Sequence, residues 1–154
     1  MDIANLITPE RIALDLKVKD KAQLLRDLAV RAEAAGAGVA ASRILVALTA
    51  REALGSTGLG KGFALPHARL EGLSGCFGLL VRLARPIDYA AIDGQKVDVV
   101  VLLLTPADGD ASHLAALSLV SRRLREGGIL GRIRRAEGSI SVMGMLSEAS
   151  AAGT

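Results

Sequence analysis

Aromatic side chains are scarce in this chain, which contains two phenylalanines, one tyrosine and no tryptophan. Proteins that bind single-stranded nucleic acid without sequence preference stack successive bases on exposed aromatic rings. Three such rings in 154 residues are too few to build that kind of surface. We therefore expect no binding of single-stranded nucleic acid.

Cysteine and histidine are also scarce. Cys76 is the single cysteine, so it has no partner for an internal disulfide, and we interpret it as a small core residue. The two histidines, His67 and His113, lie far apart in the sequence, and with one thiol they form no recognisable metal-binding motif. We expect neither a bound metal nor a cofactor.

The net charge of +3 is small, and the basic residues are scattered except for one cluster. Binding of duplex nucleic acid would need a denser basic patch than this. We interpret the cluster as a solvated helix face, with docking of an acidic protein partner as the alternative. Its members are Arg122, Arg123, Arg125, Arg132, Arg134 and Arg135.

No segment has the pattern of an export signal or a membrane span. The start MDIANLITPERIALDL lacks a basic stretch followed by an apolar run. The longest apolar run, residues 97–104, is interrupted by Asp98 and is much shorter than the roughly 20 residues that a spanning helix needs. We expect a cytoplasmic protein without membrane insertion.

The length of 154 residues and the 51% share of hydrophobic residues suit one domain with its own core. We therefore predict a single domain over residues 1–154. Its last residues, about 149–154, read ASAAGT and are expected to be frayed.

Hydrophobic spacing predicts strands mixed with helices. Strands are predicted at residues 11–18, 63–65, 76–83 and 97–104, and helices between Asp20 and Gly36, at 41–53 and at 112–126, with one or two short helices after them. Residues 55–62 are predicted as a loop and 84–95 as a connection. Because no helix separates the two strands between 63 and 83, the sheet is expected to be mixed. The predicted fold is an α/β sandwich, in which a central mixed β-sheet has helices on both faces.

The glycine-rich segment 55–62, GSTGLGKG, nearly completes the P-loop pattern G-x-x-x-x-G-K-[ST]. Gly62, however, stands where the magnesium-binding hydroxyl belongs, and a helix instead of a buried strand precedes the segment. The Rossmann pattern G-x-G-x-x-G is also incomplete here. Nucleotide hydrolysis is therefore disfavoured. The free backbone N–H groups and the two hydroxyls suit a simpler anion such as phosphate.

His67 follows this segment directly after Pro66. The proline restricts the backbone, which helps to fix where the imidazole points. With an ordinary pKa near 6.5, histidine is mostly neutral at neutral pH and has a ring nitrogen that can act as a nucleophile. From spacing alone, a hydrogen-bonded structural or surface role for His67 remains the alternative.

The run RExLGSTGxGxGxAxPHxR, from Arg51 to Arg69, resembles the phosphorylation-site signature of a known family. It is similar to the enzyme IIA domains of the fructose and mannitol type in the bacterial phosphoenolpyruvate-dependent phosphotransferase system. Residues 83–89, residues 93–98 and the pair His113-Leu114 extend the resemblance over nearly the whole chain. The opening IANLITPERIALDL resembles the nitrogen-related type of this family.

The resemblance implies that His67 is the phosphate acceptor and that Arg51 and His113 are its companions. Arg51 would offer a fixed positive fork to the phosphate oxygens, and His113 would donate a hydrogen bond. The alternatives are a surface arginine at a helix end and an exposed histidine in the first turn of a helix. Four further residues are expected to complete the phosphate cradle: Ser56, Thr57, Gly58 and Gly60.

The function implied by the resemblance is that of a phosphoryl carrier, a phosphotransferase component with a phosphohistidine intermediate. An HPr-like carrier protein would supply the phosphate, and the chain would act mainly as a nitrogen- or potassium-related regulator. One alternative is a sugar-specific subunit that passes phosphate to a IIB domain for fructose or mannitol uptake. Another is a regulatory binding module without carriage. The chain departs from the family where acidic residues often precede the second histidine, because Ala111 and Ser112 stand there.

Overall fold

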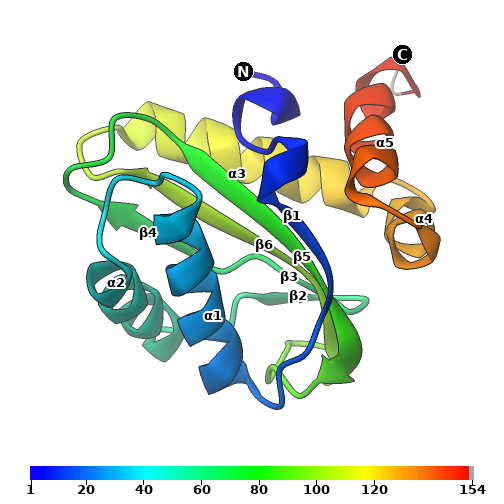
Figure 1. Cartoon of the computed structure of the whole chain (residues 1–154), viewed down its shortest axis with the longest axis horizontal. Helices are drawn as coiled ribbons and strands as arrows, with labels where there is room; N and C mark the ends of the chain where they lie inside the picture. The colour runs from blue at the N-terminus through cyan, green and yellow to red at the C-terminus, as the bar shows by residue number, and fades with distance from the viewer. Residues whose placement is uncertain (153–154) are drawn as a thin grey trace.

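The computed structural model describes residues 1–152, with side chains described as far as Glu148 (Figure 1). The strands in this part of the chain are β1 (Ile12–Leu16), β2 (Gly58–Gly60), β3 (Phe63–Ala64), β4 (His67–Leu70), β5 (Phe77–Ile87) and β6 (Val97–Pro106). The helices are α1 (Lys21–Ala34), α2 (Ala41–Ala53), α3 (Asp110–Arg125), α4 (Ile129–Arg135) and α5 (Ser139–Ala152), preceded by the short 3-10 helices Ile3–Asn5 and Pro9–Arg11.

The strands form one mixed sheet in the order β1-β5-β6-β3-β2, and β4 also pairs with β6. β6 runs antiparallel to β5 and parallel to both β3 and β4, which follow one another along its other side. β1 is parallel to β5, and β2 is antiparallel to β3. The predicted mixed sheet is therefore confirmed.

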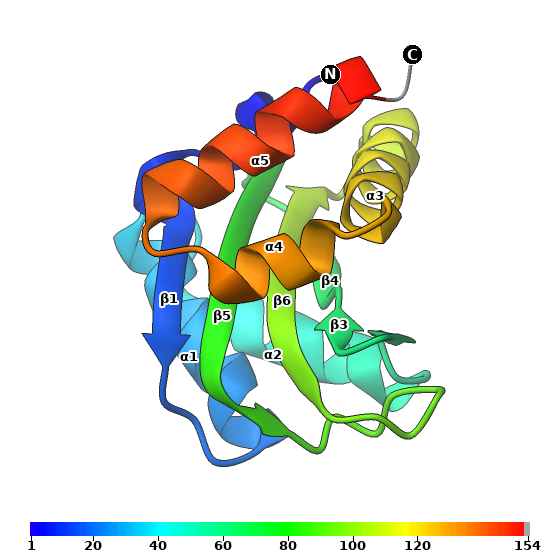
Figure 2. The ribbon, with the colours of Figure 1, turned by 90° about the vertical axis from the view of Figure 1, so that its right-hand side faces the viewer.

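Helices cover both faces of the sheet, as predicted. α1 and α2 lie on one face, and α3, α4 and α5 lie on the other (Figure 2). Alternate residues of β6 enter the two cores: Val100, Leu102 and Leu104 on the α1–α2 side, and Val99, Val101 and Leu103 on the α3–α5 side. Because both faces of this strand are buried, its sequence is a nearly continuous apolar run.

The first two helices begin and end as the sequence predicts. The Asp20 carboxylate accepts a hydrogen bond from the Gln23 backbone at 2.8 Å and caps α1. α2 ends at Ala53, and the Gly55 N–H closes its last turn on the Glu52 carbonyl at 3.1 Å. This ending leaves the side chains of the last turn of α2 next to the glycine-rich segment.

The segment predicted as a loop over 55–62 contains a strand. β2 and β3 form a hairpin whose turn residues, Lys61 and Gly62, have φ angles of 58° and 82°. Two positive φ angles are typical of the tight turns that match the twist of paired strands. The Lys61 N–H also donates to the Asp93 carboxylate at 2.9 Å, which holds the turn in place.

Several other boundaries differ from the prediction; β1, for example, covers Ile12–Leu16, a shorter stretch than the predicted 11–18. The strand predicted to stop at Pro66 is followed by β4, because the Pro66 carbonyl accepts from the Leu103 N–H at 3.0 Å and residues 67–70 then pair with β6. β5 continues to Ile87, beyond the predicted end at 83, and α3 begins at Asp110, before the predicted 112. For residues 149–154, which were predicted to be frayed, the structure describes only the backbone of 149–152, which belongs to α5. The rest of this prediction lies outside the described part of the chain.

The basic cluster is not a uniformly solvated face. Arg123 is buried on α3, with 7% of its surface exposed. Arg132 pairs with Glu148 at 2.5 Å, and Arg134 pairs with Asp98 at 2.9 Å. Part of the cluster therefore joins α4 to its neighbours.

None of the helices formed between residues 1 and 152 has both the length and the hydrophobicity required to cross a bilayer.

Candidate functional site

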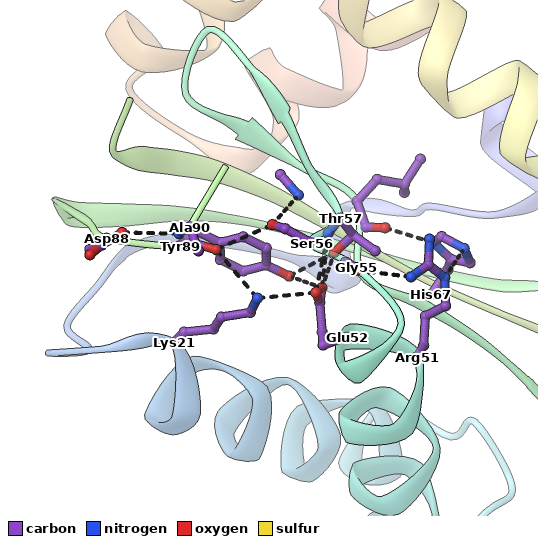
Figure 3. Close-up of polar contacts among 12 residues, drawn as sticks. Lys21, Arg51, Glu52, Gly55, Ser56, Thr57, His67, Asp88, Tyr89 and Ala90 are labelled. Atoms are coloured by element: carbon purple, nitrogen blue, oxygen red, sulfur yellow. Dashed lines mark hydrogen bonds and ion pairs between the residues drawn. The ribbon is translucent and has the colours of Figure 1, made fainter. Parts of the chain in front are cut away.

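His67 is the first residue of β4, and its ring is held by two hydrogen bonds (Figure 3). Nδ1 lies 2.8 Å from the Leu65 carbonyl oxygen. Because a carbonyl only accepts, Nδ1 carries the proton and Nε2 is left with its lone pair. The Arg51 Nε–H donates to this Nε2 at 3.3 Å. The ring therefore presents an unprotonated Nε2 beside a fixed positive charge.

Arg51 lies in the last turn of α2. Its Nη1–H donates to the Gly55 carbonyl at 2.9 Å, and its Nε–H faces His67. The guanidinium is thus held between the end of the helix and the imidazole. A basic side chain in this turn is also favoured by the partial negative charge at a helix C-terminus.

His113 approaches the same place from the first turn of α3. Its ring centroid is 5.8 Å from that of His67, and the two rings are tilted by 50°. Its Nδ1 lies 2.6 Å from the hydroxyl of Thr105, a fully buried residue near the end of β6. The structure therefore brings together three of the predicted site residues: Arg51, His67 and His113.

The surroundings favour neutral imidazoles. Burial lowers the pKa of His67, and the Arg51 charge lowers it further, against the Leu65 hydrogen bond and the Glu52 carboxylate, which raise it. Burial also lowers the pKa of His113, assisted by the charges of His67 and Arg69. Both rings are therefore ready to act as unprotonated bases or nucleophiles at neutral pH.

Asp110, one of the two acidic residues near His113, has a definite partner. Its carboxylate forms an ion pair with Arg69, whose Nη2–H also donates to the Ala107 carbonyl at 3.1 Å. This pair joins β4 to the start of α3, the two elements that carry the histidines. Arg69 remains about 38% exposed beside the site.

Thr57 and Ser56, both predicted in the phosphate cradle, make other contacts. The buried Thr57 hydroxyl lies 2.9 Å from the Tyr89 hydroxyl and also bonds to Glu52. The Ser56 hydroxyl donates to the Tyr89 carbonyl at 3.3 Å and accepts from the Gly58 N–H at 3.1 Å. These bonds tie the segment to Glu52 and Tyr89.

Gly58 and Gly60, the two glycines predicted in the phosphate cradle, have little room for a side chain. A Cβ added to Gly58 would lie 2.7 Å from the Cβ and 2.8 Å from the Cα of Ala91. Gly60 has a φ of 103°, and a Cβ there would lie 3.2 Å from the Asp93 carboxylate. Both glycines lie in β2, away from the hydrogen bonds of His67 that the structure describes.

The sequence analysis missed the polar cluster around Glu52. The side chain of this residue is 7% exposed, and its carboxylate is contacted by Thr57, Tyr89 and Lys21. Glu52 stands next to Arg51 in the signature, which was a usable signal. Lys21 and Tyr89 come from distant segments, and nothing in their local sequence indicates this contact.

Two leucines that lie close to site residues in the sequence are exposed. Leu54, just beyond α2, is 84% exposed, and Leu114, which follows His113, is 67% exposed. No group of three or more His, Cys, Asp and Glu side chains with the arrangement of a metal site occurs among the residues that the structure describes. The site thus offers one nucleophilic nitrogen, one guanidinium and a second imidazole.

Residues 5–149 match the family model described as "Phosphoenolpyruvate-dependent sugar phosphotransferase system, EIIA 2". A nitrogen regulatory protein of Bradyrhizobium diazoefficiens is 41% identical over 147 residues, which cover 96% of this chain and 95% of that protein. A fructose-specific EIIA component of Haloferax volcanii is 34% identical, over 96% of this chain and 98% of its own length.

The fold also matches a solved structure. The crystal structure of the nitrogen regulatory protein IIA-Ntr from Neisseria meningitidis superposes with a TM-score of 0.88 and 29% identity. The match covers 94% of this chain and 98% of that chain. The mixed sheet and its two helical layers are therefore shared with a nitrogen-regulatory relative.

Proposed function

The chain belongs to the EIIA 2 family of the phosphoenolpyruvate-dependent sugar phosphotransferase system, and from this membership we propose that it carries a phosphoryl group on Nε2 of His67. The observation that supports this choice of atom is the hydrogen bond from Nδ1 to the Leu65 carbonyl at 2.8 Å. It leaves Nε2 unprotonated, and the Arg51 guanidinium lies beside that nitrogen.

The transfer needs no proton removal at the accepting nitrogen, because Nε2 is already unprotonated. The lone pair of Nε2 attacks the phosphorus atom of a phosphohistidine on an HPr-like donor protein. A new N–P bond forms, the donor's N–P bond breaks, and its electron pair returns to the donor imidazole. The His67 ring gains positive charge in this step, which the bond from Nδ1–H to the Leu65 carbonyl stabilises.

Arg51 and His113 stabilise the group in transit. The moving phosphoryl group carries negative charge on its peripheral oxygens, so fixed cationic or N–H donors accelerate its transfer. Arg51 already contacts the accepting nitrogen, and the His113 ring lies 5.8 Å from that of His67. Removal of one such donor commonly costs about 10² to 10³ in rate. Ser56 and Thr57 then act by shaping the loop that holds Arg51, and Gly58 and Gly60 belong to the strand β2 that follows it.

We further propose that the phosphorylation state regulates a nitrogen- or potassium-related partner protein. A nitrogen regulatory relative that is 41% identical over 96% of the chain supports this output. The fructose-specific relative supports the second candidate, delivery of phosphate to a IIB domain.

The direct test is phosphorylation by phosphoenolpyruvate, enzyme I and an HPr-like protein, followed by mass spectrometry. We expect one phosphoryl group on the wild-type chain, none on His67→Ala and slower but complete labelling of His113→Ala. Full labelling of His67→Ala would refute the proposal. An unlabelled wild-type chain that still bound partners would favour a binding module without carriage. Transfer from the labelled chain to a fructose-type IIB domain would favour sugar uptake.

A further inference from the structure

The Glu52 cluster consists of Glu52, Thr57, Tyr89 and Lys21, which come from four separate places in the fold (Figure 3). Glu52 lies in the last turn of α2, next to Arg51, and Lys21 begins α1. Thr57 precedes β2, and Tyr89 lies in the connection between β5 and β6. None of these side chains is hydrogen-bonded to His67, although the Glu52 charge raises the pKa of that histidine, so the proposed transfer does not use them directly.

The Glu52 carboxylate is almost fully paired. It accepts from the Tyr89 hydroxyl at 2.7 Å and from the Thr57 backbone N–H at 3.1 Å, and it forms an ion pair with Lys21 at 3.1 Å. Burial would raise the pKa of Glu52, but the hydrogen bonds from Thr57, Tyr89 and Lys21 outweigh that effect and lower it. The carboxylate is therefore charged and held by donors on several sides.

Tyr89 is held at three points. Its hydroxyl donates to Glu52, and its carbonyl accepts from Lys21 Nζ at 3.3 Å. The same Nζ lies 4.3 Å from the centre of the Tyr89 ring, within the range of a cation–π contact. Burial raises the pKa of the Tyr89 hydroxyl, so it remains a donor at neutral pH.

These contacts fix the loop that orients Arg51. Glu52 holds Thr57 through both its backbone N–H and its hydroxyl, which closes residues 53–56 into a tight loop. Within that loop, the Gly55 carbonyl accepts from Arg51 Nη1 at 2.9 Å. The direction of the guanidinium, and with it the Nε–H that reaches His67, thus depends on where Gly55 is placed.

We propose that the Glu52 cluster is a positioning unit that aims the Arg51 guanidinium at the phosphoryl group on His67. The inference rests on the proposed function, since it assigns these residues a part in the same transfer. Glu52, Tyr89 and Lys21 are positioning residues that act through Arg51, and the phosphate is contacted by Arg51 itself.

The test is a double-mutant cycle on the rate of phosphoryl transfer from the HPr-like donor. Tyr89→Phe keeps the ring and removes the hydroxyl that donates to Glu52. We expect it to slow transfer about tenfold in the wild-type background. This loss is smaller than the rate acceleration of about 10² to 10³ that a donor such as Arg51 supplies, because Arg51 is misdirected and not removed. In an Arg51→Ala background the same change should have almost no effect, because the residue that it positions is gone.

Lys21→Met, with Lys19→Met as its exposed control, gives a second cycle for the case that Tyr89→Phe does not fold. An equal loss of rate in both backgrounds would mean that the cluster only maintains the fold, and would overturn the inference. So would an unchanged rate in the wild-type background.

A readout independent of transfer separates this inference from the proposed function. The Arg51 Nε–H should give a protected NMR signal in the wild-type chain and lose that protection in Tyr89→Phe. Labelling of the wild-type chain together with an unchanged Arg51 signal in the variant would overturn the positioning role alone. A wild-type chain that cannot be labelled would overturn the carrier proposal, whatever the NMR result.

Discussion

Replacement of Gly58 by alanine should destabilise the protein through a single methyl group. That methyl would lie 2.7 and 2.8 Å from two atoms of Ala91 and 3.1 Å from the Tyr89 ring. One of the Ala91 atoms is backbone, so the segment 89–91 must move to make room. Overpacking of a close-packed site typically costs about 1–3 kcal/mol. For a chain of this length, each kcal/mol lowers the melting temperature by roughly 2–4 °C, so a fall of about 2–12 °C is expected.

Thermal unfolding followed by far-ultraviolet circular dichroism measures this effect. Gly127→Ala is the matched control, because its Cβ would have nothing within 4 Å and the glycine has no positive φ. If the two variants melted at the same temperature, the steric account of Gly58 would be refuted. Because Tyr89 must shift with Ala91, Gly58→Ala should also slow phosphoryl transfer, whereas Gly127→Ala should not.

Two other predictions concern pH and the packing of α4. In the folded protein the pKa values of His67 and His113 lie below 6.5, so below that pH the unfolded chain binds more protons. The free energy of unfolding should therefore fall as the pH drops through 6.5 towards the folded pKa values. In a variant with both histidines changed to Gln, it should fall less steeply over the same pH range. An equal slope in the two proteins would contradict this account. Arg82→Met should cost about 1.5–3 kcal/mol in urea unfolding, because a charged donor to two carbonyls at the end of α4, at 2.6 and 2.9 Å, is lost. The exposed Arg85→Met on the same strand is the control, and equal losses from both variants would contradict this role for Arg82.

The elements that could be predicted from the sequence are those with local causes. The Asp20 cap, the helical spacing after it and the apolar run of β6 all lie within one segment each. They were therefore visible without knowledge of the partner elements. β4 was missed because its partner is β6, more than thirty residues further along the chain. Pro66 was predicted to end a strand, but its carbonyl accepts a hydrogen bond from the Leu103 N–H of β6, and pairing with β6 continues through β4.

The residues of the candidate site also differ in whether a local stretch of sequence indicates them. His67 and Arg51 were predicted because they share one contiguous signature, and His113 was predicted from the pair His113-Leu114, the last segment of the resemblance. Tyr89 and Lys21 are 37 and 31 positions away from Glu52, and they meet it only when α1 and the β5–β6 connection fold over α2. Local sequence does not encode such a meeting.

Tyr89 also gives the protein an internal optical reporter. It is the only tyrosine in the chain, and there is no tryptophan to mask its ultraviolet absorption or emission. Its hydroxyl is bonded to a carboxylate, and its ring lies under an ammonium group. Any rearrangement of the end of α2 must change the environment of that one chromophore. A rearrangement of the end of α2 can therefore be followed in the unmodified protein, without an attached dye.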